Sequence, residues 1–216
     1  MLERYGFEVV NLSPKDFRGR GPLAERIDSL VIADEGRGLM EGYTTGMVPP
    51  QFEGGIGEDG ARAIDSFVKD GGTLVCFNRA TAFAIQQFGL PVKNVVAGMK
   101  RQEFFTGGSV LEVEATTSHP VMAGMPARAA IFVDGSPAFE TGEGFKGEVL
   151  AKYQSTGSPL LSGYLLGERF LNDRAAALDV AYGKGHIVLL GFRPQWRGQP
   201  FGTFRVVFNA VMGGAR

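Results

Sequence analysis

The sequence has little cysteine, little histidine and almost no net charge. Its single cysteine, Cys76, excludes a disulfide within the chain and leaves the redox compartment open. The two histidines, His119 and His186, belong to no His-x-x-Glu or His-Glu-x-x-His pattern, so we expect no metal site built within this chain. A formal charge of −1 over 216 residues disfavours a nucleic-acid-binding surface.

Long apolar runs are also missing. None approaches the roughly 20 residues that a membrane-spanning helix needs, so we expect no membrane span. The first residues lack the basic, apolar and small-residue zones of a signal peptide, and the sequence leaves the location of the protein open.

Glycine, by contrast, is abundant, with 32 residues, and it predicts many turns and loops. The length and an apolar content of 44% allow one sizeable core. We expect one domain over residues 1–216, made of a parallel α/β half (1–94), a β-rich insertion or sheet extension (95–182), and a final core strand with a closing helix (183–216).

The first half alternates patterns that are typical of strands and helices. Apolar runs predict strands at residues 7–12, 29–33 and 73–78. Apolar residues at helical spacing predict a helix that Gly71 and Gly72 end, and a second helix at 79–88. This alternation predicts a parallel sheet with helices on both faces. A glycine-rich loop at 34–56 is long enough to suggest function or mobility.

The pattern changes after residue 95. Residues 109–115 alternate with period two, as a half-exposed antiparallel strand does, and short apolar runs follow up to residue 181. Phe201, Phe204, Phe208 and Val211 mark an amphipathic helix near the end.

The most informative stretch is 182–197. A Gly-Lys-Gly turn at 183–185 leads into an apolar strand that stops at Gly191 and delivers Arg193, Pro194 and Gln195 at its carboxyl end. Ligands of open α/β sheets bind at that end. The arrangement resembles class I glutamine amidotransferases, in which the same strand end carries the His-Pro-Glu part of a Cys-His-Glu triad.

The resemblance implies a catalytic site whose chemistry has been lost. Arg193 stands at the base position and stays protonated, and Gln195 carries no charge to hold an imidazolium. The nucleophile position falls at Asn78 or Arg79. Cys76 lies two or three residues too early, inside an apolar strand, where a cysteine is usually a small core residue. We therefore expect no hydrolysis by this mechanism and leave Cys76 as an alternative nucleophile.

A binding role is the other possibility for this end of the sheet. Arg193, Gln195, Trp196 and Arg197 are candidate binding residues, because arginine and tryptophan are favoured at recognition sites. They could equally form a structural lock, in which the tryptophan covers the core and the arginines pair with carboxylates. The sequence leaves both interpretations open.

Several segments carry a closer resemblance: Asp-Gly-Gly-Thr-Leu-Val at 70–75, Gln-Phe-Gly-Leu-Pro-Val at 87–92, Pro-Leu-Leu-Ser-Gly at 159–163, and 191–199. They are similar to the amidotransferase-like C-terminal domains of bacterial zinc carboxypeptidases of the carboxypeptidase A type. This resemblance implies that zinc belongs to a separate catalytic domain and that this chain needs no cofactor. It also implies that the partner is that peptidase domain or a second copy of this chain.

The same resemblance implies that the first core strand is missing. In a flavodoxin-like order that strand lies between the strands expected at 7–12 and 29–33. We expect a fragment or truncated reading frame, in which the flanking strands close the gap or leave an exposed groove. The leading hypothesis is a non-catalytic accessory domain of a zinc carboxypeptidase, acting in packing, substrate presentation or oligomerisation. The alternatives are a Cys76-dependent hydrolase or amidotransferase, and a small-molecule or glycan-binding module.

Overall fold

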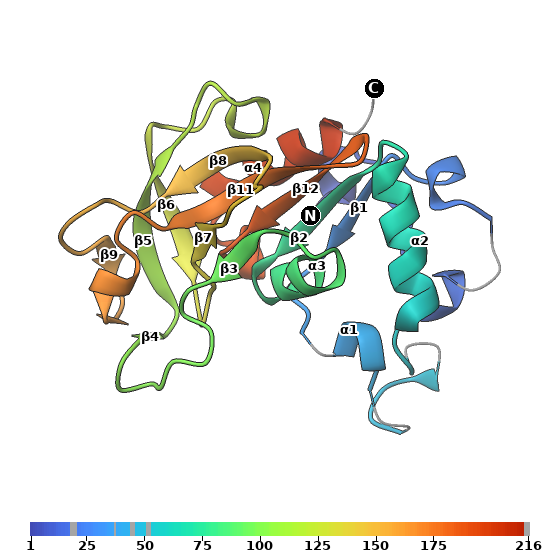
Figure 1. The fold of residues 1–216 in the computed structure, drawn as a ribbon, viewed down its shortest axis with the longest axis horizontal. Coiled ribbons are helices and arrows are strands. Elements are labelled where there is room, and N and C mark those ends of the chain that lie inside the picture. The colour runs from blue at the N-terminus through green and yellow to red at the C-terminus, as the bar shows by residue number, and fades with distance from the viewer. Residues whose placement is uncertain (18–20, 37, 44–45, 51–52, 214–216) are drawn as a thin grey trace.

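The fold is described from a computed structural model, which covers residues 1–17, 21–36, 38–43, 46–50 and 53–213. A large mixed sheet runs through the centre of the molecule, with strands in the order β1-β2-β12-β11-β8-β5-β6 (Figure 1). The first three of these strands are parallel and the remainder are antiparallel. The predicted α/β class with a β-rich antiparallel extension is thus confirmed, and the extension continues the same sheet.

The parallel part consists of β1 (Ser29–Ile32), β2 (Thr73–Phe77) and β12 (Gly185–Leu190). β2 lies between the other two, and each of its residues is buried. Its continuous apolar sequence suits a strand that is covered on both faces, which is why it contains no polar alternation.

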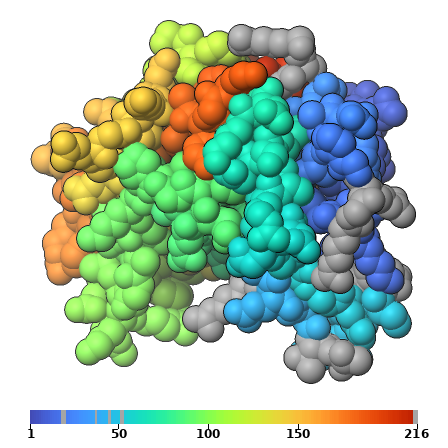
Figure 2. All heavy atoms as spheres, turned by 45° about the vertical axis from the view of Figure 1, so that its right-hand side comes forward, coloured from blue at the N-terminus to red at the C-terminus, as the bar shows by residue number. Residues whose placement is uncertain are grey.

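Helix α2 (Gly57–Lys69) connects this region as the sequence predicted. Its buried residues Ala61, Ile64, Phe67 and Val68 recur at helical spacing and face the sheet. Glu58 and Asp59 lie in the first turn, where negative charge is favourable. The space-filling view places α2 between the N-terminal residues, in blue, and the green residues that follow β2 (Figure 2).

The other helices are α1 (Gly38–Glu41), α3 (Thr81–Gln87) and α4 (Phe201–Met212). α2 and α3 cover one face of the sheet, and α4 covers the other face together with the short 3₁₀ helix Pro120–Met122 (Figure 1). Helices therefore lie on both faces, as expected. Part of the expected loop at 34–56 lies outside the described residues; within the remainder, α1 interrupts it.

The antiparallel part extends the sheet from β12. Its strands are β3 (Val92–Asn94), β5 (Ser109–Ala115), β6 (Arg128–Val133), β7 (Phe139–Thr141), β8 (Gly147–Lys152), β9 (Leu160–Ser162) and β11 (Ala175–Tyr182). Two short strands, β4 (Phe105–Thr106) and β10 (Leu165–Leu166), pair with each other in a separate two-stranded sheet. β5 alternates buried and less buried residues, as its period-two sequence predicted.

The prediction of a strand at residues 7–12 is wrong. Residues 7–12 have an extended, irregular backbone and pair with no strand in the described part of the chain, so β1 is the edge of the sheet. The physical reason is that a strand needs a hydrogen-bonded neighbour, and an open space separates this segment from β1. The described residues before β1 contain 3₁₀ turns but no strand.

Candidate functional site

The candidate site lies where the three parallel strands end. Asp34 follows β1, Asn78 follows β2 and Arg193 follows β12. The register aligns Ile32 with Cys76, and Phe77 with Leu190, so these three chain segments leave the sheet side by side. This is the edge at which open α/β sheets place their ligands.

Arg193 is held between two carboxylates. Its Nε lies 2.9 Å from Oδ2 of Asp34, and its Nη1 lies 3.2 Å from Oδ2 of Asp134. Only 12% of the Arg193 side chain is exposed. The Nε–H direction does not meet hydrogen-bond geometry, so the contact with Asp34 is an ion pair. The backbone N–H of Arg193 donates to the carbonyl of Phe132, which ties the end of β12 to β6.

Asp34 joins a second arginine to the same network. Nε of Arg79 donates to Oδ1 of Asp34 at 2.8 Å, and the Arg79 backbone N–H donates to the same oxygen at 3.3 Å. Partial burial acts to raise the pKa of Asp34, but the Arg79 hydrogen bond, the Asn78 amide and the charge of Arg193 together lower it. The carboxylate is therefore ionised at neutral pH and serves both arginines.

Trp196 covers this network from the outer side. The guanidinium of Arg193 lies 4.3 Å from the ring centroid of Trp196, and that of Arg197 lies 5.3 Å away. The same ring stacks on Phe132 with an interplanar angle of 9°. Gln195 is half-buried and lines the small cavity that remains, whereas Arg197 is exposed.

That cavity has a volume of about 20 Å³ and is bounded by Asp34, Phe77, Arg193, Pro194, Gln195 and Trp196. It has room for about one water molecule. A typical small-molecule site measures hundreds of Å³. The four binding candidates are therefore brought together, but around a closed ion-pair cluster.

Asn78 occupies the turn between β2 and the 3₁₀ turn Asn78–Ala80 that leads into α3. Its φ of 49° lies in the left-handed region, which costs energy for a residue with a side chain. A sharp strand-to-helix turn of this kind carries the nucleophile in hydrolases. The side-chain amide is fully buried and makes no hydrogen bond of good geometry in the described structure, although it lies close enough to Asp34 to lower that pKa.

Cys76 lies two residues before Asn78, in an environment unlike that of a catalytic cysteine. It is fully buried within β2, and burial raises the pKa of its thiol well above the ordinary range. Its side chain packs in the apolar cluster with Leu74 and Leu189. A neutral thiol without solvent access is a poor nucleophile.

Both histidines of the chain converge on one buried carboxylate elsewhere. Nε2 of His119 lies 3.3 Å from Oδ2 of Asp179, and Nδ1 of His186 lies 3.3 Å from Oδ1. Nδ1 of His119 accepts the backbone N–H of Val121, as expected for a turn that enters a helix. His186 lies near the start of β12, whereas Arg193 follows its end, so this cluster is remote from the candidate site.

Sequence reasoning missed Asp34 and Asp134 as partners of Arg193. A signal existed for Asp34, since it directly follows a predicted strand and so belongs at the same sheet edge. Within the described residues, no group of three or more His, Cys, Asp or Glu side chains is placed to hold a metal ion. Likewise, none of the described helices is both long and apolar enough to cross a membrane.

Neither a protein-family model nor a curated protein matches this sequence. Solved structures do match. A cytoplasmic protein from Salmonella typhimurium is 17% identical with a TM-score of 0.57, and the match covers 98% of this chain and 83% of that one. A GMP synthase-like protein from Thermoplasma acidophilum is 13% identical with a TM-score of 0.53, over 99% and 84% of the two chains.

A ThuA-like protein from Parabacteroides merdae is 15% identical with a TM-score of 0.51, over 96% of this chain and 78% of that one. At these identities the likeness concerns the fold. The chain therefore has an α/β fold of the class I glutamine amidotransferase-like kind.

Proposed function

We propose that this chain is a non-catalytic amidotransferase-like domain that acts by binding another polypeptide. The observation that carries the non-catalytic part of the proposal is the position of Arg193, which is locked between Asp34 and Asp134 at the place where a catalytic base would have to stand. A guanidinium remains protonated at neutral pH and cannot accept a proton from a nucleophile.

The other positions of such a site also lack the catalytic groups. Asn78 supplies no thiol at the strand-to-helix turn, and Gln195 supplies no carboxylate. The burial of Cys76 argues against its use as a displaced nucleophile. Losing the nucleophile or the base of such a unit costs on the order of 10⁶ in turnover in a well-studied hydrolase. A cavity of about 20 Å³ at Trp196 also leaves no room for a glycan.

The proposed role is that of an accessory domain of a zinc carboxypeptidase, in packing, substrate presentation or oligomerisation. This parentage rests on the sequence resemblance of residues 70–75, 87–92, 159–163 and 191–199 alone. Zinc would be held by the peptidase domain. The gene sequence on either side of this reading frame tests the parentage: a metallocarboxypeptidase domain there supports it, and unrelated genes on both sides contradict it.

The non-catalytic part is tested by turnover of the purified chain. Ammonia release from glutamine and hydrolysis of p-nitrophenyl acetate are measured for the native protein and for Cys76→Ser. We expect both proteins to match the rate of a denatured control. Turnover that the native protein shows and that Cys76→Ser abolishes would overturn the proposal.

A further inference from the structure

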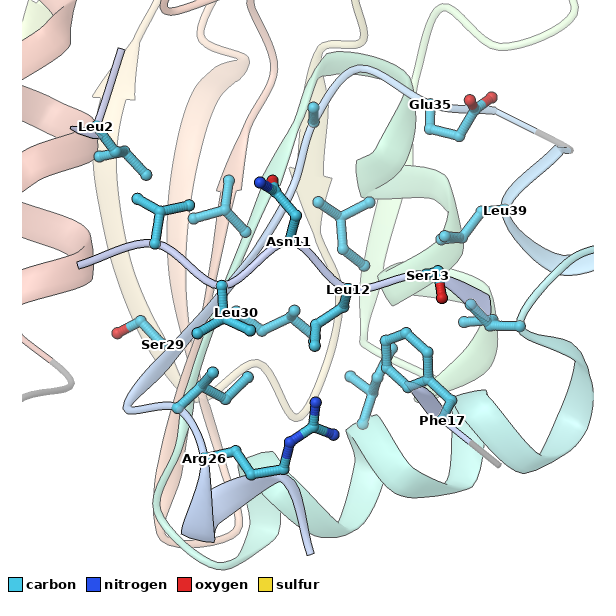
Figure 3. Close-up of a pocket in the computed structure, with 18 of the residues that line it drawn as sticks. Leu2, Asn11, Leu12, Ser13, Phe17, Arg26, Ser29, Leu30, Glu35 and Leu39 are labelled. Carbon is cyan, nitrogen blue, oxygen red and sulfur yellow. The ribbon is translucent and has the colours of Figure 1, made fainter. Parts of the chain in front are cut away.

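A groove lies along the free edge of β1. It has a volume of about 800 Å³, within the range of ligand-binding clefts, and it separates β1 from the irregular segment 7–13. Among its labelled lining residues, Leu12 and Leu30 come from the two sides of this space (Figure 3). The cavity beside Arg193, by contrast, has a volume of only about 20 Å³.

The β1 wall presents unused backbone groups. The carbonyl of Asp28 accepts the backbone N–H of Thr73 from β2. Because the backbone groups of strand residues point alternately to the two sides, those of Ser29 and Val31 are directed away from β2 and toward the groove. Within the described structure, no backbone group meets them from that side.

The opposite wall of the groove also has unpaired backbone groups. From Glu8 to Leu12, no backbone N–H or C=O makes a hydrogen bond with another described residue. β1 thus offers a row of donors and acceptors at main-chain spacing, and residues 8–12 add further unpaired backbone groups. An apolar small molecule would leave these groups unpaired, whereas an extended peptide backbone can satisfy them.

The side chains around the groove specify what such a peptide must carry. On the α2 side lie Ile56 and Ile64, and on the α4 side lie Leu2 and Val211. A strand placed here would direct alternate side chains to these two apolar layers. It would therefore be apolar at successive positions, as buried parallel strands are.

We propose that the groove binds an extended, continuously apolar peptide segment of a partner polypeptide, which adds to the sheet as a strand beside β1. β1 has four residues, so a segment of about five residues, about 17 Å long, matches it. The binding is saturable with one peptide per chain. It does not depend on the proposed absence of catalysis at Arg193.

The test uses a fluorescein-labelled peptide, Lys-Val-Ile-Val-Ile-Val-Lys, titrated with the full chain and followed by anisotropy. Two control peptides test the backbone hydrogen bonds and the apolar side-chain contacts separately. N-methylation of alternate amides removes donors but keeps the side chains, and it should weaken binding at least about tenfold. Replacing both isoleucines by serine keeps the backbone but removes apolar contacts, and it should also weaken binding at least about tenfold.

A matched pair of protein variants localises the peptide. Val10 lines the groove and is 49% exposed, so Val10→Asp places a carboxylate there with little effect on folding. Leu161 in β9 is 54% exposed and lies outside the groove, so Leu161→Asp is its control. We expect Val10→Asp alone to weaken binding, and hydrogen exchange of the Val31 amide to slow when peptide is bound.

Each other result overturns the proposal. Absence of binding does so directly, and equal binding of the N-methylated peptide would mean non-specific apolar association. Unchanged Val31 exchange in a saturated complex would place the peptide elsewhere. Light scattering of the free chain is the remaining measurement: a dimer that the peptide dissociates would identify a second copy of the chain as the occupant instead.

Discussion

Replacing Arg193 by alanine should destabilise the fold substantially. The Arg193 side chain is 12% exposed, and its partners Asp34 and Asp134 are 17% and 41% exposed. Removing one member of a buried ion pair costs about 3–5 kcal/mol, whereas exposed pairs contribute below about 1 kcal/mol. Because Asp34 keeps Arg79 and Asp134 faces solvent, we expect a loss of about 2–4 kcal/mol for Arg193→Ala.

Urea unfolding followed by tryptophan fluorescence and circular dichroism measures this loss. Arg79→Ala is the matched control, since Arg79 pairs with the same carboxylate but is 57% exposed, and it should cost less than about 1 kcal/mol. A loss below about 0.5 kcal/mol for Arg193→Ala would refute the idea of a structural lock.

The effect should also depend on pH. The pKa of Asp34 is lowered in the folded chain, so the stabilisation from its ion pairs is present above the ordinary value of 3.8 and is lost as pH falls through the folded value. The stability difference between the native protein and Arg193→Ala should therefore be full at pH 7 and smaller at pH 3. An equal difference at both values would contradict the ionised Asp34 partner.

Three further predictions concern other parts of the fold. Because Cys76 is buried with a raised thiol pKa, iodoacetamide should label it only in denaturant; mass spectrometry that finds rapid native labelling would contradict this. Gly191→Ala should cost about 1–3 kcal/mol, because its Cβ would lie 2.7 Å from the Pro137 carbonyl oxygen. Gly202→Ala in α4 has open space and should not destabilise, so equal urea midpoints for the two would refute the steric argument. His119→Ala should lower stability by about 1–3 kcal/mol, because it leaves buried Asp179 with one partner. His186 is more exposed, so His186→Ala should cost less; a larger loss for His186→Ala in thermal melts would contradict this geometry.

The sequence predicted those helices and strands that are determined by residues close together in the chain. α2 follows from apolar residues at helical spacing, charge in the first turn, and the turn at Gly71 and Gly72. β12 follows from an apolar run between a glycine turn and Gly191. The antiparallel character of β5 follows from its period of two. Each of these patterns is contained within a few neighbouring residues.

What the sequence could not supply depends on distant parts of the chain. Residues 7–12 have the composition of a strand, but strand formation depends on a hydrogen-bonded neighbour, and none adjoins them within the described residues. The ion pairs of Arg193 join segments that follow β1, β6 and β12, and no periodicity shows which carboxylate meets which arginine. The convergence of His119 and His186 on Asp179 likewise depends on sheet register.

The most direct test of the closed site is thiol reactivity at position 78. In a Cys76→Ser background, Asn78→Cys places the chain's one thiol at the strand-to-helix turn. It lies beside Asp34, the carboxylate that is ion-paired with Arg193. The rate of its reaction with Ellman's reagent is measured with Arg193 present and with Arg193→Ala added, under conditions where both proteins are folded. We expect slow labelling with Arg193 and at least about tenfold faster labelling without it, since a buried thiol reacts only when the site opens. Fast labelling at equal rates in both proteins would contradict the lock.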